Sequence, residues 1–174
     1  MAVYNYESDK SFDDVFKRAD RDMYENKNEI KSQTLVESFR QMDKLDKAIP
    51  PERKRMLDGL FGAMVTVAGE SYVYLNDMHY DYSRWSLPLI GDFGLESEYM
   101  YHADKIWLNY IHPDDIDAYK DAVDAVLCGN AELKALSYRA RKPDGTYVLL
   151  TTRGFVLCDK DGKPEYFGGI IIKQ

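Results

Sequence analysis

The sequence of 174 residues contains few of the side chains that usually carry covalent or metal chemistry, with two cysteines and three histidines. Two cysteines, Cys128 and Cys158, are too few for a disulfide framework, so we expect reduced thiols. The histidines have no metal-ligand spacing among themselves or with the cysteines, which predicts no zinc or other transition-metal site. A chain of this length buries enough surface to fold without disulfides or a structural metal.

Long apolar runs and an excess of basic residues are also absent. No stretch approaches the ~20 apolar residues of a membrane span, and the first ten residues do not look like a signal peptide. The formal net charge is −7. Residues 59–174 carry 17 acidic against 11 basic side chains, which argues against binding to nucleic acid or to an anionic membrane. We expect a cytoplasmic segment with neither contact.

Apolar side chains repeat at helical spacing through the first 68 residues. A first stripe falls within residues 12–23, and a continuing seam falls within residues 35–45. The Pro50-Pro51 pair ends the second helix and can begin a third, because proline cannot donate to the helical ladder but fits the first helical turn. The apolar stripe of the third helix comprises Met56, Leu57, Leu60, Phe61 and Met64.

Beyond Ser71 the pattern changes to strands that are rich in aromatic and β-branched residues and separated by turn-forming residues. A helix that begins at Pro113 and ends near Gly129 divides them, and residues 88–101 suit short helices and turns. This order predicts an α+β fold: a five-stranded antiparallel sheet with helices on one face, preceded by N-terminal helices. The expected strands comprise residues 72–75, 82–86, 133–142, 146–158 and 166–173.

Three motifs in this second part resemble those of a PAS domain followed by a PAC motif. They are Trp107-x-x-x-Ile111-His112-Pro113-Asp114-Asp115, Tyr138-Arg139-x-Arg141-x-x-Asp144-Gly145-x-Tyr147 and Asp161-Gly162-Lys163-Pro164-x-x-x-x-Gly169. Each motif alone is common, but the three in this order and at these spacings are specific. The resemblance covers about residues 70–174. It implies a sensory or interaction module, usually dimeric, that passes a signal to a neighbouring output domain through helices.

A second resemblance lies at the start of the chain. The motif Val15-x-x-x-Ala19-Asp20-x-x-Met23-Tyr24-x-x-Lys27 is similar to the last helix of a GGDEF diguanylate cyclase domain, and residues 2–6 look like its last strand. The glycine-glycine-acidic loop of that family is missing, because the Gly168-Gly169 pair is followed by three isoleucines. The two resemblances together imply a partial GGDEF tail at 1–31, a helical linker at 32–69 and a PAS/PAC domain at 70–174.

These resemblances imply a regulatory PAS module of a larger cyclic di-GMP signalling protein, with GGDEF or phosphodiesterase domains adjoining it and no catalysis in this chain. One alternative is a PAS sensor that holds a small metabolite between the sheet and the helix at 113–127. Another is a fragment of an active diguanylate cyclase, against which the missing glycine-glycine-acidic loop argues.

Aromatic side chains are the candidates for lining a ligand pocket, although core packing is the more common role of such rings. One candidate is His112, and for this residue helix capping together with Asp114 and Asp115 is the simpler explanation. The flavin-binding cysteine motif of light-sensing PAS domains is absent, and the scattered histidines favour neither haem nor metal, so we expect no cofactor. The candidate ligand-binding residues are Trp85, Trp107, His112, Tyr138 and Phe155.

In an intact cyclase domain the stripe at 12–23 would pack on a sheet that this chain lacks. Large apolar side chains left in water cost about 1.5–3 kcal/mol each. We therefore expect the stripe and the seam to find a second copy of the chain, because helices with a narrow apolar seam pair along it. The sequence predicts a homodimer held largely by residues 12–65.

Overall fold

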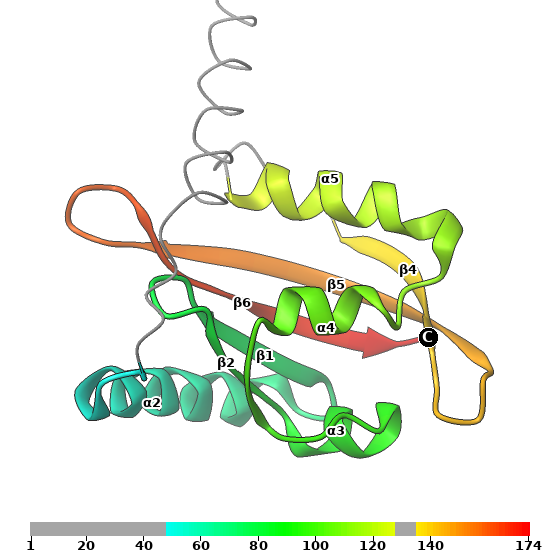
Figure 1. The fold of residues 1–174 in the computed structure, drawn as a ribbon, viewed down its shortest axis with the longest axis horizontal. Helices are drawn as coiled ribbons and strands as arrows, with labels where there is room; N and C mark the ends of the chain where they lie inside the picture. The colour runs from blue at the N-terminus through cyan, green and yellow to red at the C-terminus, as the bar shows by residue number, and fades with distance from the viewer. Residues whose placement is uncertain (1–47, 128–134) are drawn as a thin grey trace, which may run out of the picture. The chain divides into compact units, whose positions relative to one another are not determined.

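The computed structural model describes residues 48–127 and 135–174 (Figure 1). The expected helices at 12–45, the GGDEF-like segment and Cys128 lie outside the described residues. The helices are α2 (Pro51–Ala68), α3 (Leu87–Phe93), α4 (Ala103–Leu108), the 3-10 turn η1 (Pro113–Asp115) and α5 (Ile116–Leu127). The strands are β1 (Tyr72–Asp77), β2 (Tyr82–Trp85), β3 (Tyr99–Tyr101), β4 (Leu136–Arg141), β5 (Tyr147–Cys158) and β6 (Pro164–Lys173).

The strands form one antiparallel sheet in the order β3-β2-β1-β6-β5-β4. The expected α+β, PAS-like architecture is confirmed, with six strands in place of five. The additional strand, β3, lies within the stretch at 88–101 that local sequence assigned to short helices and turns. Its three residues pair with β2, where Met100 lies opposite Ser83. A strand this short is stabilised by its neighbour in the sheet and leaves little periodicity in the sequence.

The first strand of the sheet in chain order, β1, lies beside the last one, β6, in the middle of the sheet. β1 pairs on one side with β2 and on the other with β6, where Tyr72 lies opposite Ile171. The β1–β2 hairpin and the β4–β5–β6 meander are therefore joined by contacts between opposite ends of the domain. The short connections within each group follow from the turn residues, whereas the β1–β6 pairing comes from the fold as a whole.

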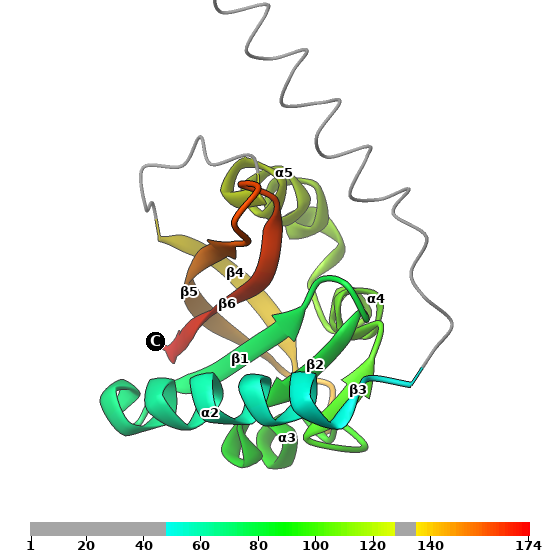
Figure 2. The same cartoon turned by 90° about the vertical axis from the view of Figure 1, so that its left-hand side faces the viewer.

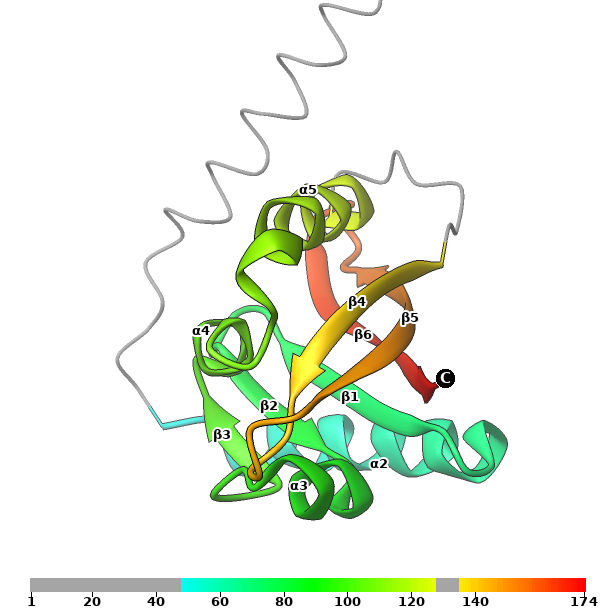
Figure 3. The same cartoon turned by 90° about the vertical axis from the view of Figure 1, so that its right-hand side faces the viewer.

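Helices cover both faces of the sheet (Figures 2 and 3). Side chains alternate along β1, so Tyr74 joins the inner core beneath α3, α4 and α5. Val73 and Leu75 face the other way and pack with Leu57 and Phe61 of α2. The expected arrangement on one face thus holds for α3, α4 and α5, while α2 covers the outer face and belongs to the same compact unit, Met42–Gln174.

The buried stripe of α2 differs from the expected one at a single residue. Leu57 and Phe61 are buried, and Leu60 and Met64 pack against them. Met56, which the sequence assigned to the stripe, is 57% exposed. The outer face of β1 and β2 accommodates a narrow stripe, and Met56 lies beside it on the helix surface.

Two glycines make room for the ring of Tyr74 on the sheet. Tyr74 lies opposite Gly169 of β6, which in turn lies opposite Gly154 of β5. A Cβ atom added at Gly169 would lie 2.7 Å from the Tyr74 hydroxyl, and one at Gly154 would lie 3.1 Å from it. The Tyr74 side chain therefore extends across β6 as far as β5, over positions that no side chain occupies.

Candidate functional site

Three of the five candidate ligand-binding residues meet in the inner core. Trp85 ends β2, Trp107 belongs to α4 and Tyr138 belongs to β4, and all three are buried. The two indole rings meet edge to face with centroids 5.2 Å apart. The Trp107 Nε1–H donates a hydrogen bond to the Tyr138 hydroxyl at 3.1 Å. The structure places these three rings in one core between the sheet and the helices, and a ligand among them stays a prediction.

The other two candidates lie elsewhere. His112 precedes η1, and its Nδ1 accepts a hydrogen bond from the Asp114 backbone N–H at 3.2 Å. Its ring contacts Tyr147 edge to face, so the expected capping role is confirmed. Leu57 and Phe61 of α2 form an outer cluster with Val73 and Leu75 of β1. Phe155 is half-buried against this outer cluster, on the opposite face of the sheet from Tyr138. A pocket in the inner core would therefore not include Phe155.

Hydroxyl groups add polar character to this apolar core. Burial raises the pKa of Tyr74 to about 12, although a hydrogen bond with Thr152 opposes that effect. Burial also raises the pKa of Tyr119 and of Tyr138, whose rings meet edge to face at 5.0 Å. All three phenols are therefore neutral near pH 7. They can donate or accept hydrogen bonds to a bound molecule, but none is an activated nucleophile or base.

The sequence did not single out Tyr74 or Thr152 as part of this group, and it assigned Tyr119 only to the buried stripe of its helix. Their positions in alternating strands and on one helical face predict burial, but not which other hydroxyl-bearing residues they join in the core. Among the described residues, no three His, Cys, Asp or Glu side chains are placed to hold a metal ion.

A charged pair fastens the N-terminal end of α5 to β4. Asp115 Oδ2 accepts from the Arg139 backbone N–H at 2.8 Å and from its Nε–H at 2.9 Å, and Oδ1 accepts from Nη2 at 2.7 Å. The sequence assigned Asp115 to the first turn of the helix, where the dipole favours it. The structure adds an arginine partner 24 positions away. This bidentate geometry positions α5 over the inner core.

The variant Asp115→Asn should lose less stability on acidification than the wild type does. Hydrogen bonds from Arg139 lower the pKa of Asp115 from 3.8 to about 2. Because the folded-state pKa lies below the unfolded one, this contribution is complete above about pH 4 and disappears as the pH falls towards 2. Urea melts should show the wild type more stable at pH 7, with the difference shrinking between pH 4 and 2. A difference independent of pH would contradict the assignment.

Within the described residues, no helix has the length and apolar character needed to cross a membrane. No curated protein matches this sequence.

Solved structures with related folds include a domain of a diguanylate cyclase and a domain of a histidine kinase. The N-terminal domain of a diguanylate cyclase with a PAS/PAC sensor from Marinobacter aquaeolei is 19% identical, with a TM-score of 0.51 over 60% of this chain and 94% of that one. A domain described as part of a light and redox sensing histidine kinase from Haloarcula marismortui is 14% identical, with a TM-score of 0.50 over 64% and 96%. At these identities the likeness concerns the fold. Residues 91–171 match the family model described as PAS fold, and this part of the chain is a PAS fold domain.

Proposed function

We propose that this chain is a sensory or regulatory module of a cyclic di-GMP signalling protein. The observation that carries the proposal is the combination of a cyclase-like motif at 15–27 with a PAS fold domain at 91–171 in one chain. The Marinobacter domain comes from a diguanylate cyclase, which is compatible with this role, although its likeness is one of fold. In this proposal the adjoining GGDEF or phosphodiesterase domains perform the chemistry, and this chain performs none.

The arrangement of the sheet supports a relay role for α2. Tyr74 faces the inner core, while Val73 and Leu75 on the same strand contact α2. A rearrangement in the inner core that shifts β1 would therefore change the surface on which α2 rests. Packed cores shift between discrete arrangements instead of deforming continuously, which makes a strand shared by two cores a means of passing on a signal.

The test measures cyclic di-GMP turnover in the parent protein. The 174-residue chain with GTP and Mg²⁺ should form no cyclic di-GMP, whereas the parent protein should turn it over at a rate that Tyr138→Phe alters. This variant removes one inner-core hydroxyl and leaves the ring. Product formation by the chain alone would support the alternative of an active cyclase fragment. Turnover by the parent protein that is identical with and without the substitution would count against control by the inner core.

A second candidate function, a PAS sensor for a small metabolite, is favoured by the three tyrosine hydroxyls, Tyr74, Tyr119 and Tyr138, that belong to one apolar core. Ligand sites combine an apolar wall with a few polar groups that fix orientation, and the inner core has both. Native mass spectrometry of protein purified from its host should then show a retained small molecule. Tyr74→Phe should weaken the binding of this molecule. Protein that carries no such molecule, and gains no stability from a metabolite extract, would contradict it.

We further propose that this chain forms a homodimer, in which residues 12–65 hold the two copies together. Apolar side chains of the N-terminal stripe and seam need a surface, and α2 adds Met56 and Val65, which are exposed. The full chain should be a dimer at tens of micromolar by light scattering, and residues 48–174 should be a monomer or a clearly weaker dimer. The cut at 48 keeps Leu57 and Phe61, which cover the outer face of the sheet.

Two outcomes would contradict this interface. A monomeric full chain would remove the need for a partner surface, and equal dimerisation of the two lengths would move the interface to residues 48–174. The residues that form the proposed stripe and seam are Phe12, Val15, Phe16, Ala19, Met23, Leu35, Phe39, Met42 and Leu45.

A further inference from the structure

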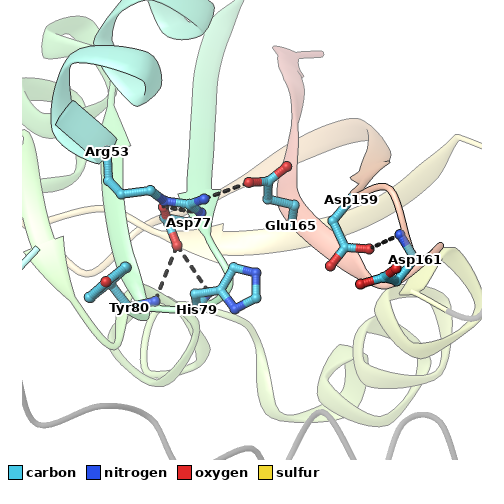
Figure 4. A network of polar contacts seen from close by, with 7 residues as sticks. All are labelled: Arg53, Asp77, His79, Tyr80, Asp159, Asp161 and Glu165. Atoms are coloured by element: carbon cyan, nitrogen blue, oxygen red, sulfur yellow. Dashed lines mark hydrogen bonds and ion pairs between the residues drawn. The ribbon is translucent and has the colours of Figure 1, made fainter. Parts of the chain in front are cut away.

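A buried carboxylate lies at the junction between α2 and the sheet (Figure 4). Asp77 ends β1 and is 0% exposed. Its Oδ1 accepts from the backbone N–H groups of His79 and Tyr80 at 3.0 and 3.1 Å, in the turn between β1 and β2. Its Oδ2 accepts from Arg53 Nε at 2.9 Å and lies 2.7 Å from Arg53 Nη2. One carboxylate therefore binds both the turn and the helix.

Arg53 connects α2 with a second strand as well. Its Nη1 pairs with Glu165 near the start of β6, and Glu165 accepts through its backbone carbonyl from Met78 N–H at 3.0 Å. The guanidinium lies 5.1 Å from the centre of the Tyr166 ring and 5.9 Å from that of Tyr80. A single side chain from the first turn of α2 thus contacts both the β1–β2 turn and β6, and these two segments are also hydrogen-bonded to each other.

The ion pairs that α2 makes with the sheet come from its first two turns. Besides Arg53, Asp58 pairs with Arg84 at 3.0 Å and accepts from the Tyr99 hydroxyl at 2.8 Å. Residues 59–68 contact the sheet through apolar side chains, those of Leu60, Phe61, Met64 and Ala68. Val67 in the same half does not take part and is 86% exposed. This second half also contains Gly59 and Gly62, which lower helix propensity by about 1 kcal/mol each relative to alanine. The first half of α2 is therefore the half that charge holds in place.

The energetics of Asp77 depend on that helix. A buried ion pair contributes little beyond an apolar contact, but losing one partner leaves an uncompensated buried charge, which is strongly destabilising. Without the arginine, Asp77 would keep only the two turn amides. The carboxylate regains water most directly if the first half of α2 moves away from it, since α2 lies over the outer cluster and the inner core lies across the sheet.

We propose that the Arg53–Asp77 pair is a latch that holds the first half of α2 on the sheet, and that breaking it releases this half while the inner core stays folded. The latch depends on how α2 is docked and is independent of cyclic di-GMP. It gives the outer face two states: α2 docked with the pair formed, and α2 displaced with Asp77 in water.

Hydrogen exchange on the full chain tests the latch. In Arg53→Gln, amides at 54–60 should exchange about tenfold to a hundredfold faster than in the wild type, because local opening becomes easier. Amides of β4 and β5 should change by less than about twofold. Tryptophan fluorescence should be unchanged, because Trp85 and Trp107 both lie in the inner core.

Arg55→Gln is the matched control. It removes the same charge from the same helix turn, but Arg55 is exposed, so its exchange should match the wild type. Asp77→Asn keeps an oxygen acceptor for the turn amides and leaves no buried charge, so it should accelerate exchange at 54–60 less than Arg53→Gln does. Arg53→Lys keeps the charge without the forked geometry and should lie between the wild type and Arg53→Gln.

Two results would overturn the latch. Equal exchange in Arg53→Gln and Arg55→Gln would show that the pair does not hold α2. Acceleration spread evenly over α2, β4 and β5 would show that the pair supports the whole fold. If Arg53→Gln does not fold, Arg53→Lys decides the question by the same comparison between α2 and the two strands.

Discussion

Gly169→Ala should destabilise the protein by about 3 kcal/mol or more, at the upper end of what overpacking costs. A Cβ atom at this position would lie 2.3 Å from the backbone oxygen of Arg153 and 2.7 Å from the Tyr74 hydroxyl. The first neighbour is main chain in the adjacent strand, so it can move only if the β5–β6 pairing moves. The second is a ring wedged among the side chains of the inner core. Urea melts followed by far-ultraviolet circular dichroism measure the loss.

Gly91→Ala provides the matched control. This glycine lies within α3, and an added Cβ atom would have no heavy atom within 4 Å. The same substitution should here raise stability by about 0.5–1 kcal/mol, because alanine loses less conformational freedom on helix formation. A loss below about 1 kcal/mol in Gly169→Ala would mean that Tyr74 can leave its place over the glycines at little cost.

Trp107→Ala should cost about 3–5 kcal/mol, the usual range for deleting a fully buried tryptophan ring. The ring is 1% exposed. It meets Phe93 at 5.1 Å and Trp85 at 5.2 Å, edge to face in both cases, and lies stacked on Tyr110 at 5.6 Å. The deletion leaves a cavity that these rings cannot all close, and it leaves the Tyr138 hydroxyl without its donor. Chemical denaturation with fluorescence from Trp85 gives the value.

Leu87→Ala is the comparison for this deletion, because Leu87 is largely exposed at the start of α3. Its loss should stay within about 0.5 kcal/mol. Trp85→Ala should fall in the same range as Trp107→Ala, and the two should not add, since the rings are in contact. A cost below about 1 kcal/mol for either ring would mean that the inner core collapses into the space it leaves.

Local sequence predicted those elements whose formation depends on neighbours in the chain. The turn signals at Asp144-Gly145 and Asp161-Gly162 place β4, β5 and β6 correctly, since Gly145 and Gly162 both adopt positive φ. The double proline places the start of α2 at Pro51. β3 escaped prediction because three residues at a sheet edge are defined by their partner strand and carry no period of their own.

Within the site, burial was easier to predict than partnership. Trp85 and Tyr138 could be assigned to a half-buried strand face from alternation alone. Phe155 was named as a candidate beside them, but alternation does not say which face of the sheet is the inner one. The Arg53–Asp77 contact joins residues 24 positions apart through folding of the hairpin beneath the helix. No pattern of charge within α2 distinguishes Arg53 from Arg55.

The pairing of β1 with β6 has a consequence for the time course of folding. The β1–β2 and β4–β5–β6 units can form locally, but each leaves one strand edge open until the two meet. Closing a loop of this length is entropically costly before its contacts form, so the sheet should assemble late and cooperatively. During synthesis one edge of β1 stays unpaired until β6 emerges, while α2, made earlier, can already pack on the outer face of β1. The helix that rests on β1 in the finished domain is thus positioned to keep the apolar outer face of that strand from wrong contacts while its edge awaits β6.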